Sequence, residues 1–169
     1  MKLRSLHINH FGHFADFDLP LRADGFQVLL GQNEAGKTTL LEFLRSVLFG
    51  FPERTPYAFA GSGELGGVAT MSLADGREVE LRRRKGRKNT VSVQIDGQET
   101  SLDETGFTHL LGHANRNLFS SVFAFGLSEL SSGEESLKHE SLQSALFGGG
   151  MGGALSPNAK TDENRFRFA

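Results

Sequence analysis

The chain has 169 residues, enough for one domain of ordinary size, and its formal net charge is −2. It contains no Cys, which excludes disulfide scaffolds, zinc fingers and thiol nucleophiles. Because the global field is weak, a nucleic-acid partner would have to be bound by a local basic patch.

The first thirty residues show the hydrophobic alternation of strands. Leu6 and Ile8 alternate with polar residues, and so do Phe17 and Leu19, which predicts half-buried strands. Residues 26–30 (Phe-Gln-Val-Leu-Leu) are almost continuously apolar and predict a strand buried on both faces. The N-terminus lacks the apolar core of a secretory signal, and no stretch has the roughly 18 apolar residues of a membrane helix. We therefore expect a cytoplasmic protein with no membrane partner.

A phosphate-binding loop follows this apolar run. The pattern G-x-x-x-x-G-K-[ST] is matched at every fixed position by Gly31, Gln32, Asn33, Glu34, Ala35, Gly36, Lys37 and Thr38. Its glycines allow a tight turn whose N–H groups point at phosphate oxygens, and the next helix adds the positive end of its dipole. We expect Lys37 to reach the β- and γ-phosphates and the Thr38 hydroxyl to ligate Mg²⁺. The alternative is a turn that binds nothing, which leaves a lysine opposing the helix dipole unexplained.

The elements after the loop are predicted from periodicity and turn residues. A helical period runs from Thr38 to Phe51, and Pro52 ends it. Residues 53–66 read as a surface loop. Strands at 68–73 and 78–82 flank an Asp-Gly hairpin turn, and an alternating strand at 91–95 follows. We expect helices near 103–111 and 115–121, and a short buried strand at 122–125. A helix opened by capping boxes should then run to about Phe147.

A run of positive charge lies at the tip of the second hairpin. It places six cations in seven residues, namely Arg82, Arg83, Arg84, Lys85, Arg87 and Lys88. One interpretation is a contact with the DNA backbone, where each neutralised phosphate adds salt dependence. The other is a solvated hairpin loop. No aromatic residue interleaves with the run, so single-strand stacking is not indicated.

Histidines and phenylalanines near the N-terminus have ordinary structural explanations. His7, His10 and His13 are spaced by three, which alternates faces on a strand, so they would not converge on a metal. Phe11 and Phe14 would pack over the phosphate loop near an adenine or belong to the core, and we favour the core.

A phosphate loop defines a site, not a reaction. The guanine-reading Asn-Lys-x-Asp of GTPases is absent, and residues 103–106 match the D-x-x-G pattern only at chance level. Two hairpins directly after the first helix break the βαβα alternation of small-molecule kinases.

Three segments carry a resemblance to a known family. They are LHINHFGHFADFDL (6–19), GQNEAGKTTLLEFLRSVLFGF (31–51) and VFAFGLSELSSGEESL (122–137). Together with the order of elements, they resemble the N-terminal half of an ATPase head of the SMC and recombination-repair class, and especially bacterial YhaN-type AAA proteins. The resemblance covers about residues 1–153. It implies an α/β P-loop NTPase fold, the N-terminal lobe of an ABC/SMC-type head with a β-hairpin-rich subdomain.

The resemblance also implies ligands and domain bounds. We expect residues 1–147 to form the lobe and 148–169 to be a glycine-rich, disordered tail. The ligands implied are ATP and Mg²⁺, with contacts from Asn33, Gly36, Lys37, Thr38 and Thr39, and we add Gly31, Glu34 and Ala35 from the loop motif.

In that family a coiled coil and a C-terminal lobe follow, and the second lobe supplies the signature motif, Walker B and the catalytic Glu. Two heads sandwich ATP, and hydrolysis moves the coiled coil on DNA. The resemblance therefore implies DNA, the second lobe and a head-to-head homodimer as partners, and a role in DNA repair or recombination.

The sequence departs from this pattern in its second half. The nearest match to Walker B, residues 91–96, alternates and reads as a hairpin strand. Residues 130–134 resemble the L-S-G-G-E signature, but we interpret them as a helix cap. No Gln lies near residues 122–126, and whether Glu129 substitutes for it stays open. The catalytic residues are thus unassigned, and we expect slow or no ATP hydrolysis without a second lobe. The alternative is a non-hydrolysing, nucleotide-gated DNA-binding or interaction module.

Overall fold

The computed structural model describes residues 1–22, 24–58, 63–88, 90–102, 104–124 and 126. The helices and strands among them, in chain order, are β1 (Lys2–Phe11), β2 (Phe14–Pro20), α1 (Lys37–Phe49), β3 (Gly66–Ser72), β4 (Glu78–Arg84), β5 (Val91–Ile95), β6 (Gln98–Thr100), α2 (Glu104–Leu110), α3 (Arg116–Leu118) and the π-helical turn η1 (Phe119–Phe123). No helix in this part of the chain is both long and apolar enough to cross a bilayer.

The strands form one antiparallel sheet in the order β2-β1-β3-β4-β5-β6. The pairs Leu6–Ala69, Ala69–Leu81 and Leu81–Val93 place apolar side chains in register on one face. Because side chains alternate along a strand, the neighbouring positions place polar residues on the other face. The strands predicted at the N-terminus, in the first hairpin and at 91–95 are all confirmed.

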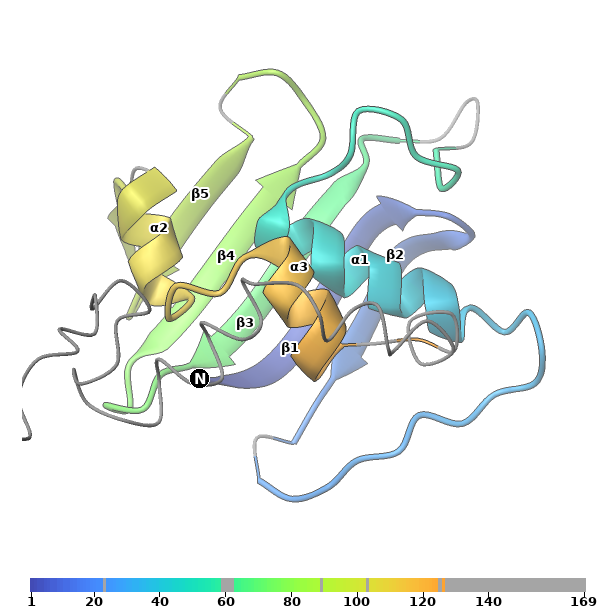
Figure 1. Ribbon diagram of the computed structural model, residues 1–169, viewed down its shortest axis with the longest axis horizontal. Helices are drawn as coiled ribbons and strands as arrows, with labels where there is room; N and C mark the ends of the chain where they lie inside the picture. The colour runs from blue at the N-terminus through green and yellow to red at the C-terminus, as the bar shows by residue number, and fades with distance from the viewer. Residues whose placement is uncertain (23, 59–62, 89, 103, 125, 127–169) are drawn as a thin grey trace, which may run out of the picture. The chain divides into compact units, whose positions relative to one another are not determined.

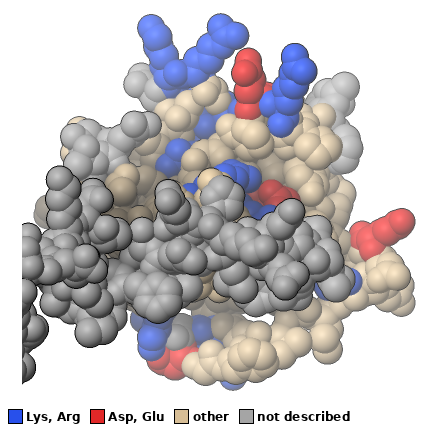
Figure 2. Space-filling view, viewed as in Figure 1, with Lys and Arg blue, Asp and Glu red and all other residues tan. Residues whose placement is uncertain are grey.

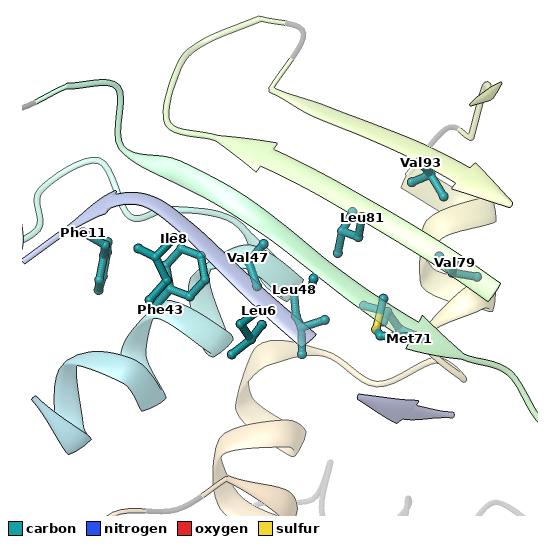
Figure 3. Close-up of a cluster of buried hydrophobic side chains, with 12 residues drawn as sticks. Leu6, Ile8, Phe11, Phe43, Val47, Leu48, Met71, Val79, Leu81 and Val93 are labelled. Carbon is teal, nitrogen blue, oxygen red and sulfur yellow. The ribbon is translucent and has the colours of Figure 1, made fainter. Parts of the chain in front are cut away.

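Helix α1 packs across the apolar face of the sheet (Figure 1). It begins after Gly36 and ends at Gly50, close to the predicted bounds. Phe43 and Val47 are completely buried, and the Phe43 ring meets the Phe11 ring edge-on with centroids 5.6 Å apart. Figure 3 shows these side chains converging with Leu6, Ile8, Met71, Val79 and Leu81 between helix and strands. This core fixes α1, and therefore the loop that precedes it, on the sheet.

Three charged residues connect α1 to the segment around α3 and η1. The buried guanidinium of Arg45 donates to the carbonyl oxygen of Ala124 and pairs with Glu42. Arg116 donates to the Gly50 carbonyl at 3.0 Å and lies 3.4 Å from Glu42. Each buried charge thus has a partner, as burial in a low-dielectric interior requires.

Two predicted strands are wrong. Residues 26–30 are not in a strand, and Phe26 and Leu30 are 93% and 89% exposed. A strand needs hydrogen-bonded neighbours, and the sheet of the described residues offers this segment no pairing position. Residues 122–125 were expected to form a buried strand, but Phe119–Phe123 is a π-helical turn with Phe123 exposed. Short apolar runs do not by themselves distinguish a strand from a helical turn.

The helices predicted near 103–111 and 115–121 are confirmed as α2 and as α3 with η1. The helix predicted to end near Phe147, the signature-like residues 130–134, Glu129 and the tail at 148–169 lie outside the described residues.

Candidate nucleotide-binding site and basic hairpin

Gly36 ends the phosphate loop and caps α1. Its φ of 93° lies in the left-handed region, which glycine enters without strain. The helix starts with the bond from the Leu40 N–H to the Gly36 carbonyl, 2.8 Å long, and no side chain caps it. There is also no acidic residue in its first turn. The first amide N–H groups and the positive helix end therefore remain available to an anion.

Lys37 folds back over the start of the loop. Its ammonium donates to the carbonyl oxygens of Gly31 and Gln32 at 2.7 and 2.6 Å. The loop is closed further by the Ala35 N–H, which donates to the Gln32 carbonyl at 3.2 Å. A cation is thus held at the mouth of an exposed loop, where it is positioned for phosphate oxygens.

The remaining loop residues are arranged around this lysine. Thr38 is exposed and Thr39 half-buried, while the other predicted contacts are exposed, namely Gly31, Asn33, Glu34 and Ala35. Glu34 adopts a left-handed φ of 67°, which is uncommon for a non-glycine residue and shows that the turn is tight. All predicted nucleotide contacts therefore lie in one loop and the first helical turn.

The turn between β1 and β2 packs against this loop. A Cβ added at Gly36 would collide with the His13 imidazole and come within 2.8 Å of Phe14 Cζ. A Cβ at Gly12 would lie 2.7 Å from Thr39 Cγ2, and the Gly12 N–H donates to the Tyr57 carbonyl at 2.9 Å. Both glycines are required for this close packing. Sequence reasoning did not place His13 beside the loop, because nothing local relates the two segments.

The residues present fit a triphosphate with Mg²⁺. The loop offers uncapped amides, a lysine ammonium and, at Thr38, an exposed hydroxyl of the kind that ligates Mg²⁺. Metal binding through protein side chains alone is not supported, since no group of three or more His, Cys, Asp or Glu gathers within the described ranges. His7 instead pairs with Asp18 at 2.7 Å.

The basic run divides between the two faces of the sheet. Arg82 lies opposite Ser92 on the polar face and pairs with Glu80 at 3.2 Å, while Arg84 pairs with Glu64 at 2.8 Å. Arg83 points to the helix side. Its guanidinium donates to the carbonyls of Val47 and Leu48 at the end of α1, at 2.9 and 3.3 Å. It also stands 5.1 Å above the Phe107 ring.

Arg83 therefore stabilises the fold, a role that the charge run alone did not indicate. The signal was present in the alternation, because Arg83 shares the inward register of Val79 and Leu81. Arg87 and Lys88 are exposed in the loop between β4 and β5, and Lys85 is half-buried. Figure 2 shows Lys and Arg side chains projecting at the top of the view, where Figure 1 places this loop.

The nearest sequence match to Walker B is a hairpin strand. Residues Val91–Ile95 form β5, paired with β4 on one side and β6 on the other, and a turn at Asp96 and Gly97 follows. Asp96 Oδ1 accepts from the Glu78 N–H at 2.9 Å, so this carboxylate closes the hairpin. The prediction that residues 91–96 are not a Walker B strand is confirmed.

Comparisons with known proteins agree on one class. A family model described as "AAA domain" (AAA_27) matches residues 1–162. The chain is 31% identical over 152 residues to YhaN of Bacillus subtilis, a protein described as uncharacterized, and the match covers 88% of this chain and 16% of YhaN. It is 28% identical over 123 residues to the DNA replication and repair protein RecF of Gloeobacter violaceus, covering 70% of this chain and 32% of RecF.

A solved structure supports the fold. It comes from work on ATP-driven dimerization and DNA-stimulated activation of SMC ATPases, and it superposes with a TM-score of 0.55 at 16% identity. The match covers 86% of this chain and 96% of that one. The predicted fold class, the N-terminal lobe of an SMC-type P-loop ATPase head, is confirmed. The chain spans about a sixth of YhaN and about a third of RecF.

Proposed function

This chain belongs to the AAA domain family AAA_27, and on that premise we propose that it is the ATP-binding lobe of an SMC/RecF-like ATPase acting in DNA repair or recombination. The observation that carries the proposal is the loop at Gly36, where a left-handed glycine begins an uncapped helix beside the Lys37 ammonium. The loop concentrates amide donors and one cation on an exposed surface, which is the chemistry that polyphosphate binding requires.

Each loop residue has a role in this proposal. The Lys37 ammonium leaves the carbonyls of Gly31 and Gln32 and pairs with the β- and γ-phosphates, gaining a charged acceptor in place of neutral ones. Thr38 holds Mg²⁺ through its hydroxyl, and the metal neutralises charge on the phosphate oxygens. The amides of Gly36 and of the first helical turn orient the phosphates.

We propose further that hydrolysis requires a second lobe. Two observations support this. Residues 91–96, the nearest match to Walker B, form a hairpin strand. The apolar segment before the loop is exposed, with Val28 and Leu29 61% and 51% accessible. Burying such side chains stabilises a protein by about 1.5–3 kcal/mol each, so a segment of this kind is expected to pair with further strands.

The experiment compares ATP binding and turnover in the chain and in Lys37→Ala. We expect the chain to bind Mg-ATP weakly, to turn it over at or near the background rate, and to lose binding by at least tenfold in the variant, which removes a charge-assisted contact. Because Lys37 is exposed, circular dichroism should show an unchanged fold. Robust turnover that disappears in Lys37→Ala would contradict the need for a second lobe. Binding that is equal in both proteins would contradict the site.

The basic hairpin supports a second candidate, a nucleotide-gated DNA-binding module in which hydrolysis plays no part. Its exposed cations include Arg82 and Arg84 on the polar face, and Arg87 and Lys88 in the loop. Duplex binding should weaken with rising salt, and Arg82→Gln with Arg84→Gln should lower the slope of log K against log [salt] by about 0.9 per lost phosphate contact. DNA affinity that depends on ATP but not on hydrolysis favours the module. DNA affinity unchanged by the double substitution removes the hairpin from either proposal.

A further inference from the structure

His13 lies at the phosphate loop although it is remote from it in sequence. Its imidazole fills the space that a side chain at Gly36 would occupy, and the ring is exposed. Neither the loop motif nor any fold requirement described above uses this side chain. The question is which part of a bound nucleotide an exposed ring at this position would meet.

The two ends of the loop can be distinguished. Lys37, which reaches the β- and γ-phosphates, has its ammonium at the carbonyls of Gly31 and Gln32, at the start of the loop. The β1–β2 turn contacts the other end, with His13 against Gly36 and Gly12 against Thr39. A triphosphate lying along the loop would therefore have its terminal phosphate near Gly31 and its nucleoside near His13.

The ring of His13 is supported from within the protein. Its centroid lies 4.2 Å from that of Phe14, and Phe14 lies 4.8 Å from Phe17. Phe14 and Phe17 are half-buried, so the row of rings runs from the core to one exposed ring beside the loop. A ring held in this way loses little freedom when another ring packs on it, which favours stacking.

We propose that the His13 imidazole is the surface on which the base of the nucleotide stacks. The inference rests on the proposed function, since it needs a nucleotide in the loop. Stacking uses the π-face that every base has. The contact therefore adds affinity for nucleotides over inorganic polyphosphate without selecting between adenine and guanine.

The test measures the affinity of the 169-residue chain for Mg-ATP, Mg-GTP and inorganic tripolyphosphate. His13→Ala should weaken ATP and GTP about tenfold each and leave tripolyphosphate unchanged, because only the base is lost as a partner. His13→Phe should retain ATP affinity within about threefold, since it keeps a ring. His113→Ala removes another exposed histidine, one whose ring packs on His109, and serves as the matched control.

Three outcomes would overturn the inference. Equal loss of ATP and tripolyphosphate in His13→Ala would assign the imidazole to the phosphates or to loop packing. No loss of ATP would remove it from the site. Failure of His13→Phe, with the fold intact by circular dichroism, would show that a ring is not what matters. Failure of the proposed function is distinguishable, because then Lys37→Ala would leave the affinity for all three ligands unchanged.

Discussion

Arg82 and Arg83 are adjacent arginines for which the structure predicts opposite effects on stability. The perturbation is Arg83→Met, which keeps an unbranched apolar side chain but removes the guanidinium. The substitution deletes the bonds to the Val47 and Leu48 carbonyls and the contact with the Phe107 ring. It also removes a positive charge from the negative end of α1, where cations are favourable.

The magnitude follows from these contacts. A charge-assisted hydrogen bond contributes about 1.5–3 kcal/mol when desolvated. The bond to Val47 is 2.9 Å long and the one to Leu48 is 3.3 Å, and Arg83 is only half-buried. The second bond and the solvent exposure lower the sum, so we expect a total loss of about 2–3 kcal/mol including the dipole term. Arg82→Met removes only an ion pair in which the arginine side chain is 61% exposed, which is expected to cost about 0–1 kcal/mol.

The assay is urea unfolding followed by circular dichroism for the parent chain and the two variants. With a slope of about 1.5 kcal/mol per molar urea, Arg83→Met should lower the midpoint by roughly 1.5–2 M. Arg82→Met should lower it by less than about 0.7 M on the same slope. Equal midpoints for the two variants would refute the assignment of Arg83 as a clamp on the end of α1.

Two further predictions concern the core and the single tyrosine. Phe43→Ala should destabilise the fold by about 3–5 kcal/mol in urea unfolding, because Phe43 is completely buried between α1 and the sheet. Phe123→Ala, at a 68% exposed ring, should cost less than about 1 kcal/mol, and equal losses would contradict this core. Burial, followed by the nearby charge of Glu42, raises the pKa of Tyr57 above its ordinary value. Tyr57 is the only tyrosine in the chain, so tyrosinate absorbance in the native protein should titrate above the midpoint measured in denaturant. The raised pKa means that the folded state keeps its proton longer than the unfolded state. Its stabilising contribution is therefore complete below about pH 10 and is lost as the pH rises through the folded pKa. Identical native and denatured midpoints would contradict the burial of Tyr57.

Much of the fold could be predicted because it depends on short-range patterns. The alternation in β3 and β4 around an Asp-Gly turn, and the helical period after Thr38, report which side of each element is apolar. The loop motif likewise assigns Gly36 and Lys37 without knowledge of any other segment. The β5 strand was distinguished from a Walker B strand by its alternation alone, since a strand with one solvated face is not the apolar run of a central parallel strand.

The errors and omissions share a physical cause. An apolar run states that side chains need burial, but it does not state against what. Residues 26–30 were therefore assigned to a strand whose neighbours are not among the described residues. A run of six cations likewise reads as one patch until the pleat divides it and turns Arg83 towards the end of α1.

The sequence by itself determined the phosphate loop, the hairpins and the amphipathic helix, because each is encoded by residues within a few positions of one another. Only the tertiary structure decided that Arg83 binds the end of α1, that Arg45 and Arg116 share Glu42, and that His13 lies at Gly36. These contacts join residues that are distant along the chain. They form only after the sheet has assembled and α1 has packed on it, and no local periodicity records them.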